Sequence, residues 1–108
     1  MTVRLYLWQR LTAALMAPMV LAHLAIIFYA SRQGLTAAAM LARTRGSFGW
    51  ALFYGVFVVA ASIHASIGLN NVLCEWSPLK ERGSGVLASA FGALLFLLGL
   101  RAVMAVVS

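Results

Sequence analysis

One histidine, His64, lies within a long uncharged segment and is the residue best placed to do chemistry. Residues 48–71 contain no Asp, Glu, Lys or Arg. An ionisable side chain at membrane depth is costly, so by default it marks a cofactor, ion or proton site. Neutral imidazole is also a good iron ligand, and Gly68 lies one helical turn further along the same face. Because glycine has no side chain, we expect a notch there against which a flat ring could lie.

A second histidine, His23, lies in another apolar segment and at another depth. His23 follows Arg10 by 13 residues, so at 1.5 Å per residue it is about 20 Å from the face where the N-terminus enters. The segment with His64 runs the other way, and His64 lies six residues before Asn70, or about 9 Å from that face. Metal–nitrogen bonds of about 2 Å cannot absorb a mismatch on the order of 10 Å. The two histidines of one chain therefore cannot hold one iron, and each needs a further ligand from elsewhere.

The composition predicts the elements that position these residues. Of the 108 residues, 64% are hydrophobic and 9% are charged, which is typical of an integral membrane protein. Three apolar segments, about 11–30, 49–71 and 85–107, have the roughly 20 residues that a helix needs to cross the bilayer. Backbone groups in lipid must be hydrogen-bonded internally, so the segments are helices. We predict an all-α membrane protein: one domain, 1–108, with three transmembrane helices in an up-down bundle.

The connections are predicted from shorter patterns. Residues 35–42 could form a short interfacial helix, and residues 76–83 form a turn-rich loop. The first apolar segment is too long for a typical signal peptide and contains His23, so we expect it to be retained. Pro18 is expected to kink that helix or to pack against a neighbour.

The net charge of +6 does not indicate a nucleic-acid partner. The basic residues are scattered at the ends of apolar segments, a pattern typical of anchoring to lipid headgroups. Four lie on the N-terminal side and four on the opposite side, so charge gives no orientation: Arg4, Arg10, Lys80 and Arg82 against Arg32, Arg43, Arg45 and Arg101.

Three helices enclose little space, and bundle proteins typically bind a porphyrin between four helices. We therefore hypothesise that a second membrane subunit, identical or related, completes the coordination of haem b at His64 and, at a deeper level, at His23. For each histidine, a polar hydrogen bond between helices is the competing interpretation.

Two motifs carry a resemblance to a known family. The first precedes the first apolar segment and reads Tyr6-Leu7-Trp8-Gln9-Arg10-Leu11-Thr12-Ala13; the second ends the middle segment and comprises His64, Gly68, Asn70, Asn71 and Glu75. Over nearly the whole chain, this order of features resembles the cytochrome b membrane-anchor subunits of succinate dehydrogenase and fumarate reductase. The resemblance implies that His64 is the axial ligand of haem b. It also implies that Arg10, with Tyr6 and Thr12, lines a quinone pocket at the cytoplasmic face of a bacterial inner membrane.

By the same resemblance, the N-terminus and the 76–83 loop face the cytoplasm, where iron–sulfur and flavoprotein subunits dock. His23 resembles the first-span histidines of two-haem members. The sequence departs from the family where Tyr6 replaces a serine, and where Asn70 and Asn71 replace an Arg-His pair. Asn71 can hydrogen-bond to a haem propionate but cannot neutralise it.

The expected role is electron transfer between a flavin/iron–sulfur module and quinone, without catalysis by this chain. The sequence has no nucleotide motif and only one cysteine, Cys74, so flavin and clusters must lie on partners. The catalytic partner could be a different flavin-dependent dehydrogenase. Two further classes are a small transporter, which needs a carboxylate within the membrane, and a non-redox assembly protein. Glu75 and Glu81 lie outside the predicted spans, which counts against the transporter.

Overall fold

The fold is a layer of three long helices closed at one end by a short fourth. The computed structural model describes residues 3–78 and 81–108. Its helices are α1 (Val3–Gln33), α2 (Ala37–Thr44), α3 (Phe48–Trp76) and α4 (Glu81–Val107). Within the described residues, α1, α3 and α4 are long and apolar enough to cross a membrane. The prediction of an all-α membrane bundle is confirmed.

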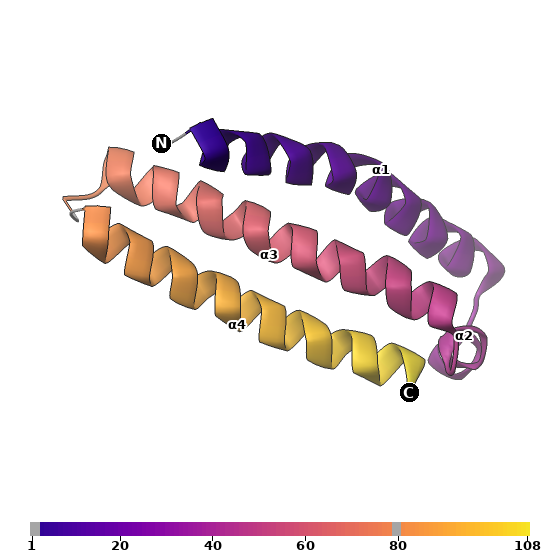
Figure 1. Cartoon of the computed structure of the whole chain (residues 1–108). Coiled ribbons are helices and arrows are strands. Elements are labelled where there is room, and N and C mark those ends of the chain that lie inside the picture. The colour runs from indigo at the N-terminus through magenta and orange to yellow at the C-terminus, as the bar shows by residue number, and fades with distance from the viewer. Residues whose placement is uncertain (1–2, 79–80) are drawn as a thin grey trace.

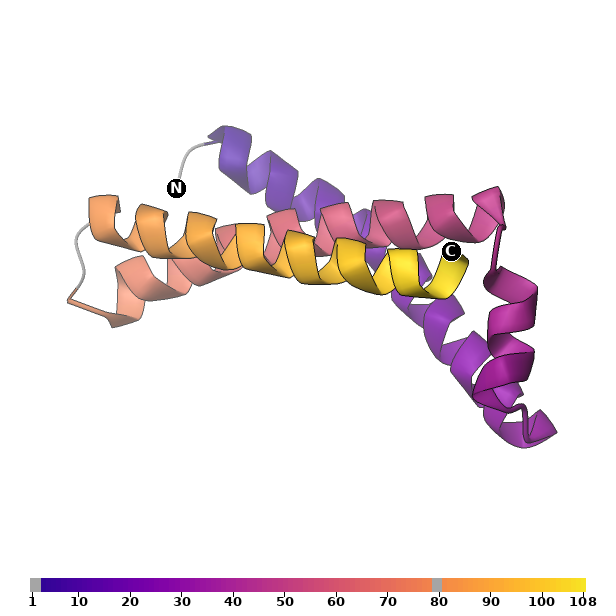
Figure 2. The ribbon, with the colours of Figure 1, turned by 90° about the horizontal axis from the view of Figure 1, so that it is seen from below.

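Helix α3 is the centre of the layer. It contacts α1 on one side and α4 on the other, and consecutive long helices run in opposite directions (Figure 1). Figure 2 shows α1 running obliquely to α3 and α4, so that the C-terminal end of α1 lies away from them, beside α2. Figure 1 shows α1 changing direction near its middle, and Pro18, which cannot donate a backbone hydrogen bond, lies within it.

The helices extend beyond the apolar segments predicted from hydropathy. Helix α1 begins at Val3 rather than at residue 11, and α4 begins at Glu81 rather than near residue 85. Hydropathy marks only the part of a helix that suits hydrocarbon. The backbone can continue its helical hydrogen bonds through polar residues at the membrane border, so helix and span differ in length.

The two connections also differ from the prediction. The interfacial helix is shifted by two residues, because Thr36 caps it by accepting a hydrogen bond from the backbone N–H of Ala39 at 3.2 Å. The predicted 76–83 loop is too long, since Trp76 ends α3 and residues 81–83 belong to α4. Residues 79 and 80 of that predicted loop lie outside the described residues.

Close packing joins α3 to α4 at small residues. A Cβ added to Gly99 would lie 2.6 Å from Val58 Cγ1, and one added to Gly92 would lie 2.9 Å from Ser66 Cβ. The Ser66 hydroxyl donates a hydrogen bond to the Ala88 carbonyl at 2.9 Å. Small residues let membrane helices approach this closely, so the α3–α4 hairpin is the tightly packed part of the layer.

We expect Gly99→Ala to destabilise the chain by about 1–3 kcal/mol, because the new methyl group would overlap all three atoms of the branched Val58 side chain. Gly55→Ala is the matched control, since a Cβ there meets nothing within 4 Å. Thermal unfolding of both variants in one detergent measures the difference. Equal unfolding temperatures for Gly99→Ala and Gly55→Ala would contradict this account of the contact.

Candidate functional site

Both histidines lie in the seam between α1 and α3, and each is paired with a hydroxyl of the opposite helix. His64 on α3 has its Nδ1 atom 3.3 Å from the Thr12 hydroxyl on α1. His23 on α1 has its Nδ1 atom 3.4 Å from the Tyr54 hydroxyl on α3. In one pair the imidazole is on α3 and the hydroxyl on α1, and in the other pair the two helices exchange these roles. We call the contact between the two helices at His64, Thr12, His23 and Tyr54 the α1–α3 seam.

The surroundings of Thr12 fix the direction of its hydrogen bond to His64. Thr12 is only 5% exposed, and its hydroxyl oxygen lies 2.8 Å from the Trp8 carbonyl and 3.0 Å from the Gln9 carbonyl. Its single proton goes to one of these carbonyls, which can only accept. The hydroxyl then accepts from Nδ1–H of His64, and in the neutral imidazole that makes this bond the lone pair is on Nε2. A neutral imidazole in this tautomer is prepared to ligate iron through Nε2.

The two pairs lie at separate levels along the layer. Tyr54, the partner of His23, precedes His64 by ten residues on α3, or about 15 Å at 1.5 Å per residue. This is larger than the separation of about 10 Å estimated from the sequence, and it keeps the imidazoles well apart. His64 and His23 are therefore too far apart to ligate the same metal ion.

Gly68 faces α1, where Gln9 covers it. The Gln9 side-chain nitrogen, Nε2, lies 3.8 Å from the position of a Gly68 Cβ, and the Asn71 side-chain amide donates to the Gln9 side-chain oxygen, Oε1, at 3.2 Å. The notch expected at Gly68 is thus filled by an amide of the same chain. Gln9 was not predicted as a site residue, although it lies three residues before Thr12 and hence on the same face of α1.

The first motif is split between two faces of α1. Arg10 is exposed and donates a hydrogen bond from Nη1 to the Tyr6 hydroxyl at 3.1 Å, with its guanidinium 5.6 Å from the centre of the Tyr6 ring. Thr12 instead points into the seam. Arg10 and Tyr6 therefore form one exposed pair, and the structure brings Thr12 to His64 rather than to that pair.

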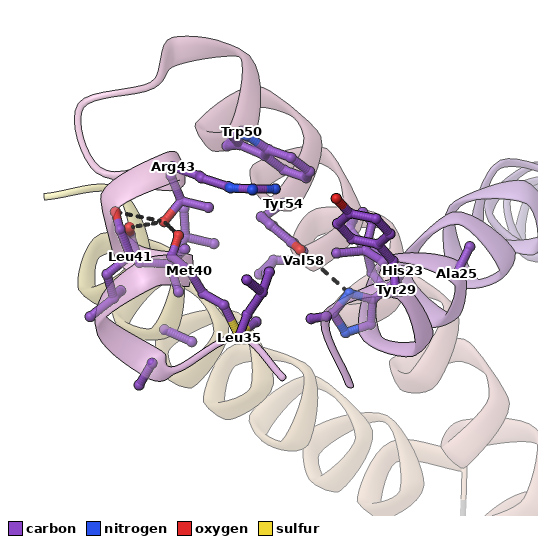
Figure 3. A pocket seen from close by; sticks show the side chains of 18 of the residues that line it. His23, Ala25, Tyr29, Leu35, Met40, Leu41, Arg43, Trp50, Tyr54 and Val58 are labelled. Atoms are coloured by element: carbon purple, nitrogen blue, oxygen red, sulfur yellow. Dashed lines mark hydrogen bonds between the residues drawn. The ribbon is translucent and has the colours of Figure 1, made fainter. Parts of the chain in front are cut away.

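A cavity of about 860 Å³ adjoins His23 at the opposite end of the layer from Arg10. Residues of all four helices line it, and its walls are mostly apolar. His23 meets the rings of Tyr54 and Phe57 edge-on, and Trp50 stacks on Tyr54 with the ring centres 5.7 Å apart. Figure 3 shows the Arg43 side chain extending from α2 toward Trp50 and Tyr54, which places a cation beside this apolar space.

Helix α2 closes the cavity at the end of the layer. The Thr44 hydroxyl donates to the Val106 carbonyl at 2.8 Å, and the Gly46 N–H donates to the Val107 carbonyl at 2.6 Å. Gly46 adopts a positive φ of 75°, a conformation that favours glycine. These bonds hold α2 against the end of α4, and the exposed Arg43 side chain belongs to the same short helix.

The two histidines are the candidate iron ligands of the seam. Within residues 3–78 and 81–108, no three His, Cys, Asp or Glu residues come together. Each seam imidazole stands alone as a ligand with its Nδ1 atom bound. One imidazole from one helix is what a porphyrin iron takes from a single chain, since the macrocycle supplies the equatorial ligands. The residues therefore fit haem.

Comparison with known protein families gives a match over most of the chain. The family model described as succinate dehydrogenase/fumarate reductase transmembrane subunit matches residues 1–100. No curated protein and no solved structure matches the chain.

Proposed function

The chain belongs to the family of succinate dehydrogenase/fumarate reductase transmembrane subunits, and from this membership we propose that it is a haem b-binding membrane anchor. In this role it carries electrons between a peripheral flavin/iron–sulfur dehydrogenase module and quinone. The single observation that carries the proposal is the His64–Thr12 pair, in which a buried hydroxyl holds the tautomer suited to axial ligation.

In this proposal, residues at different depths of the membrane have different roles. His64 would ligate one haem through Nε2, and Thr12 would hold its ring. A bound haem supplies one-electron chemistry, and the protein tunes its potential through axial ligation, hydrogen bonds and burial. Asn71, which already donates to Gln9, lies near enough to Gly68 on α3 to serve a haem propionate as a neutral donor.

His23 is the candidate ligand of a second haem, next to the cavity. The apolar walls exclude water from a macrocycle there, and the Arg43 guanidinium suits a propionate carboxylate. The only acidic residues of the chain, Glu75 and Glu81, stand at the end of α3 and the start of α4, at the other end of the layer.

Arg10 and Tyr6 would bind the quinone at the N-terminal end of the layer. The guanidinium can donate to a quinone carbonyl, and Tyr6 holds it at the membrane border. We propose that this end faces the cytoplasm of a bacterial cell, where iron–sulfur and flavoprotein subunits would dock. The substrate of the flavoprotein could be succinate, fumarate or that of a different flavin-dependent dehydrogenase.

The experiment that tests the proposal is purification of the complex from its native membrane, followed by a pyridine haemochrome assay and a reduced-minus-oxidised spectrum. We expect haem b and an α-band in the reduced state. A complex with its flavoprotein bound but without haem b would overturn the cytochrome assignment.

We expect Arg10→Ala to lower kcat/KM for quinone about tenfold or more, because a hydrogen bond from a charged donor contributes about 1.5–3 kcal/mol. Dehydrogenase activity with a soluble dye acceptor should stay unchanged. Arg4→Ala is the control, since Arg4 is also exposed on α1 near the same end. Steady-state assays with both acceptors measure the effect, and equal quinone turnover in the two variants would remove Arg10 from the site.

A further inference from the structure

We propose that Tyr54 is a positioning residue of the His23 site, and that its hydrogen bond to that imidazole reverses when the site is filled. Without haem, the Tyr54 hydroxyl donates to Nδ1 of His23, so the ring carries its proton on Nε2. When His23 ligates iron through Nε2, the same hydroxyl accepts from Nδ1–H. This inference rests on the proposed function, because it takes His23 as the ligand of the second haem.

The ring of Tyr54 is held in place by its neighbours. Trp50 stacks on it with an interplanar angle of 19°, and Phe53 meets it edge-on with the ring centres 5.0 Å apart. His23 meets the same ring edge-on from α1, and its Nδ1 atom lies 3.4 Å from the hydroxyl oxygen (Figure 3). The hydroxyl proton can turn about the C–O bond, so the hydrogen bond can reverse while the ring keeps its position.

The two hydroxyls of the seam differ in the acceptors that surround them. The Thr12 hydroxyl has two backbone carbonyls of α1 at 2.8 and 3.0 Å for its proton, so it accepts from His64. In the part of the chain that the structure describes, the Tyr54 hydroxyl has no hydrogen-bond partner besides Nδ1 of His23. Its proton is available to that nitrogen, and a phenol O–H is a stronger donor than the N–H of a neutral imidazole. In the haem-free chain, His64 and His23 therefore have opposite tautomers.

Ligation requires His23 to change its tautomer. When Nε2 gives its lone pair to iron, the proton of the neutral ring must be on Nδ1. The ring exchanges these protons with water, and its charge does not change. Tyr54 then accepts from Nδ1–H, which holds the ring and makes the ligand more basic. A contact of 3.4 Å is at the long end of the range for a hydrogen bond, so neither direction is locked.

The tautomers can be measured without any cofactor. The full chain is made with isotope-labelled histidine under haem limitation and reconstituted in lipid. Its nitrogen NMR spectrum then contains the resonances of two imidazoles, because the sequence has two histidines. We expect a protonated Nδ1 for His64 and a protonated Nε2 for His23, and a His64→Gln variant assigns the signals. The same tautomer at both histidines would overturn the inference.

The variant that tests the role of Tyr54 in this spectrum is Tyr54→Phe, which keeps the ring and removes the hydroxyl. We expect the His23 resonances to shift and those of His64 to stay. Tyr29→Phe is the matched control, because Tyr29 is a second phenol close to His23 on α1 and makes no hydrogen bond with it in the described structure. Unchanged His23 resonances in Tyr54→Phe would overturn the inference.

The haem-loaded complex provides the second measurement. Without an acceptor for Nδ1–H, His23 is a less basic ligand, which favours reduced iron. We expect Tyr54→Phe to raise the midpoint potential of the haem at the His23 level and to leave that at the His64 level unchanged. An unchanged potential at the His23 level would overturn the inference, as would a complex with haem at the His64 level alone. A complex without any haem b would contradict the proposed function instead, and the spectrum of the haem-free chain would still decide the direction of the Tyr54 bond.

Discussion

Replacing His64 by alanine is expected to lower the haem b content of the complex by about half, because one of the two proposed iron sites loses its axial ligand. The lost haem should be the one nearer the Arg10 end of the layer. Electron transfer from the dehydrogenase module to quinone should fall with it. Haem quantification against protein, together with reduced-minus-oxidised spectra, measures the change.

The control for this prediction is His23→Ala, which removes the other seam imidazole. We expect it to lower haem content by a similar amount but to leave the spectrum of the His64-level haem in place. If His64→Ala kept the full haem content, His64 would be no ligand, whatever the origin of the bound haem.

The second large effect is expected for Thr12→Val, which keeps the shape of the side chain and removes the hydroxyl. Nδ1–H of His64 then loses its acceptor in a buried place, since Thr12 is 5% exposed. Loss of such a supporting hydrogen bond typically lowers metal affinity about 10- to 100-fold. We expect weaker haem retention during dilution and a shift in the midpoint potential of one haem.

Thr12→Ser separates this effect from a change in packing. Serine restores the hydroxyl between the Trp8 carbonyl and His64 but lacks the methyl group. Haem retention and potential should therefore return toward those of the unchanged chain, even if stability does not. A Thr12→Ser variant that behaves like Thr12→Val would assign Thr12 a packing role only.

The spans and the depths of the histidines could be predicted from the sequence because both follow from simple lengths. Lipid requires an uninterrupted apolar segment, and the rise per residue then converts position into depth. This is why the order of residues sufficed to assign His23 and His64 to different levels. The helices extend beyond the predicted spans because hydropathy does not report helical residues outside the hydrocarbon.

The partners within the seam could not be predicted in the same way. Helices α1 and α3 are apolar nearly all round, so their sequences do not show which face of one meets the other. Thr12 was grouped with Arg10 and Tyr6 by its place in a motif. Residues two positions apart in a helix, such as Arg10 and Thr12, nevertheless point to different sides. Tyr54, Gln9 and Arg43 were missed as site residues for the same reason, since only the rotation of each helix brings them to the histidines or the cavity.

The oblique course of α1 has a consequence for how the protein is assembled. The α3–α4 hairpin is joined by close steric fit, whereas α1 is held across from it by two hydroxyl–imidazole bonds and the Gln9 amide. Such bonds within a membrane are individually weak. We therefore expect the hairpin to form first during biogenesis and α1 to dock on it last.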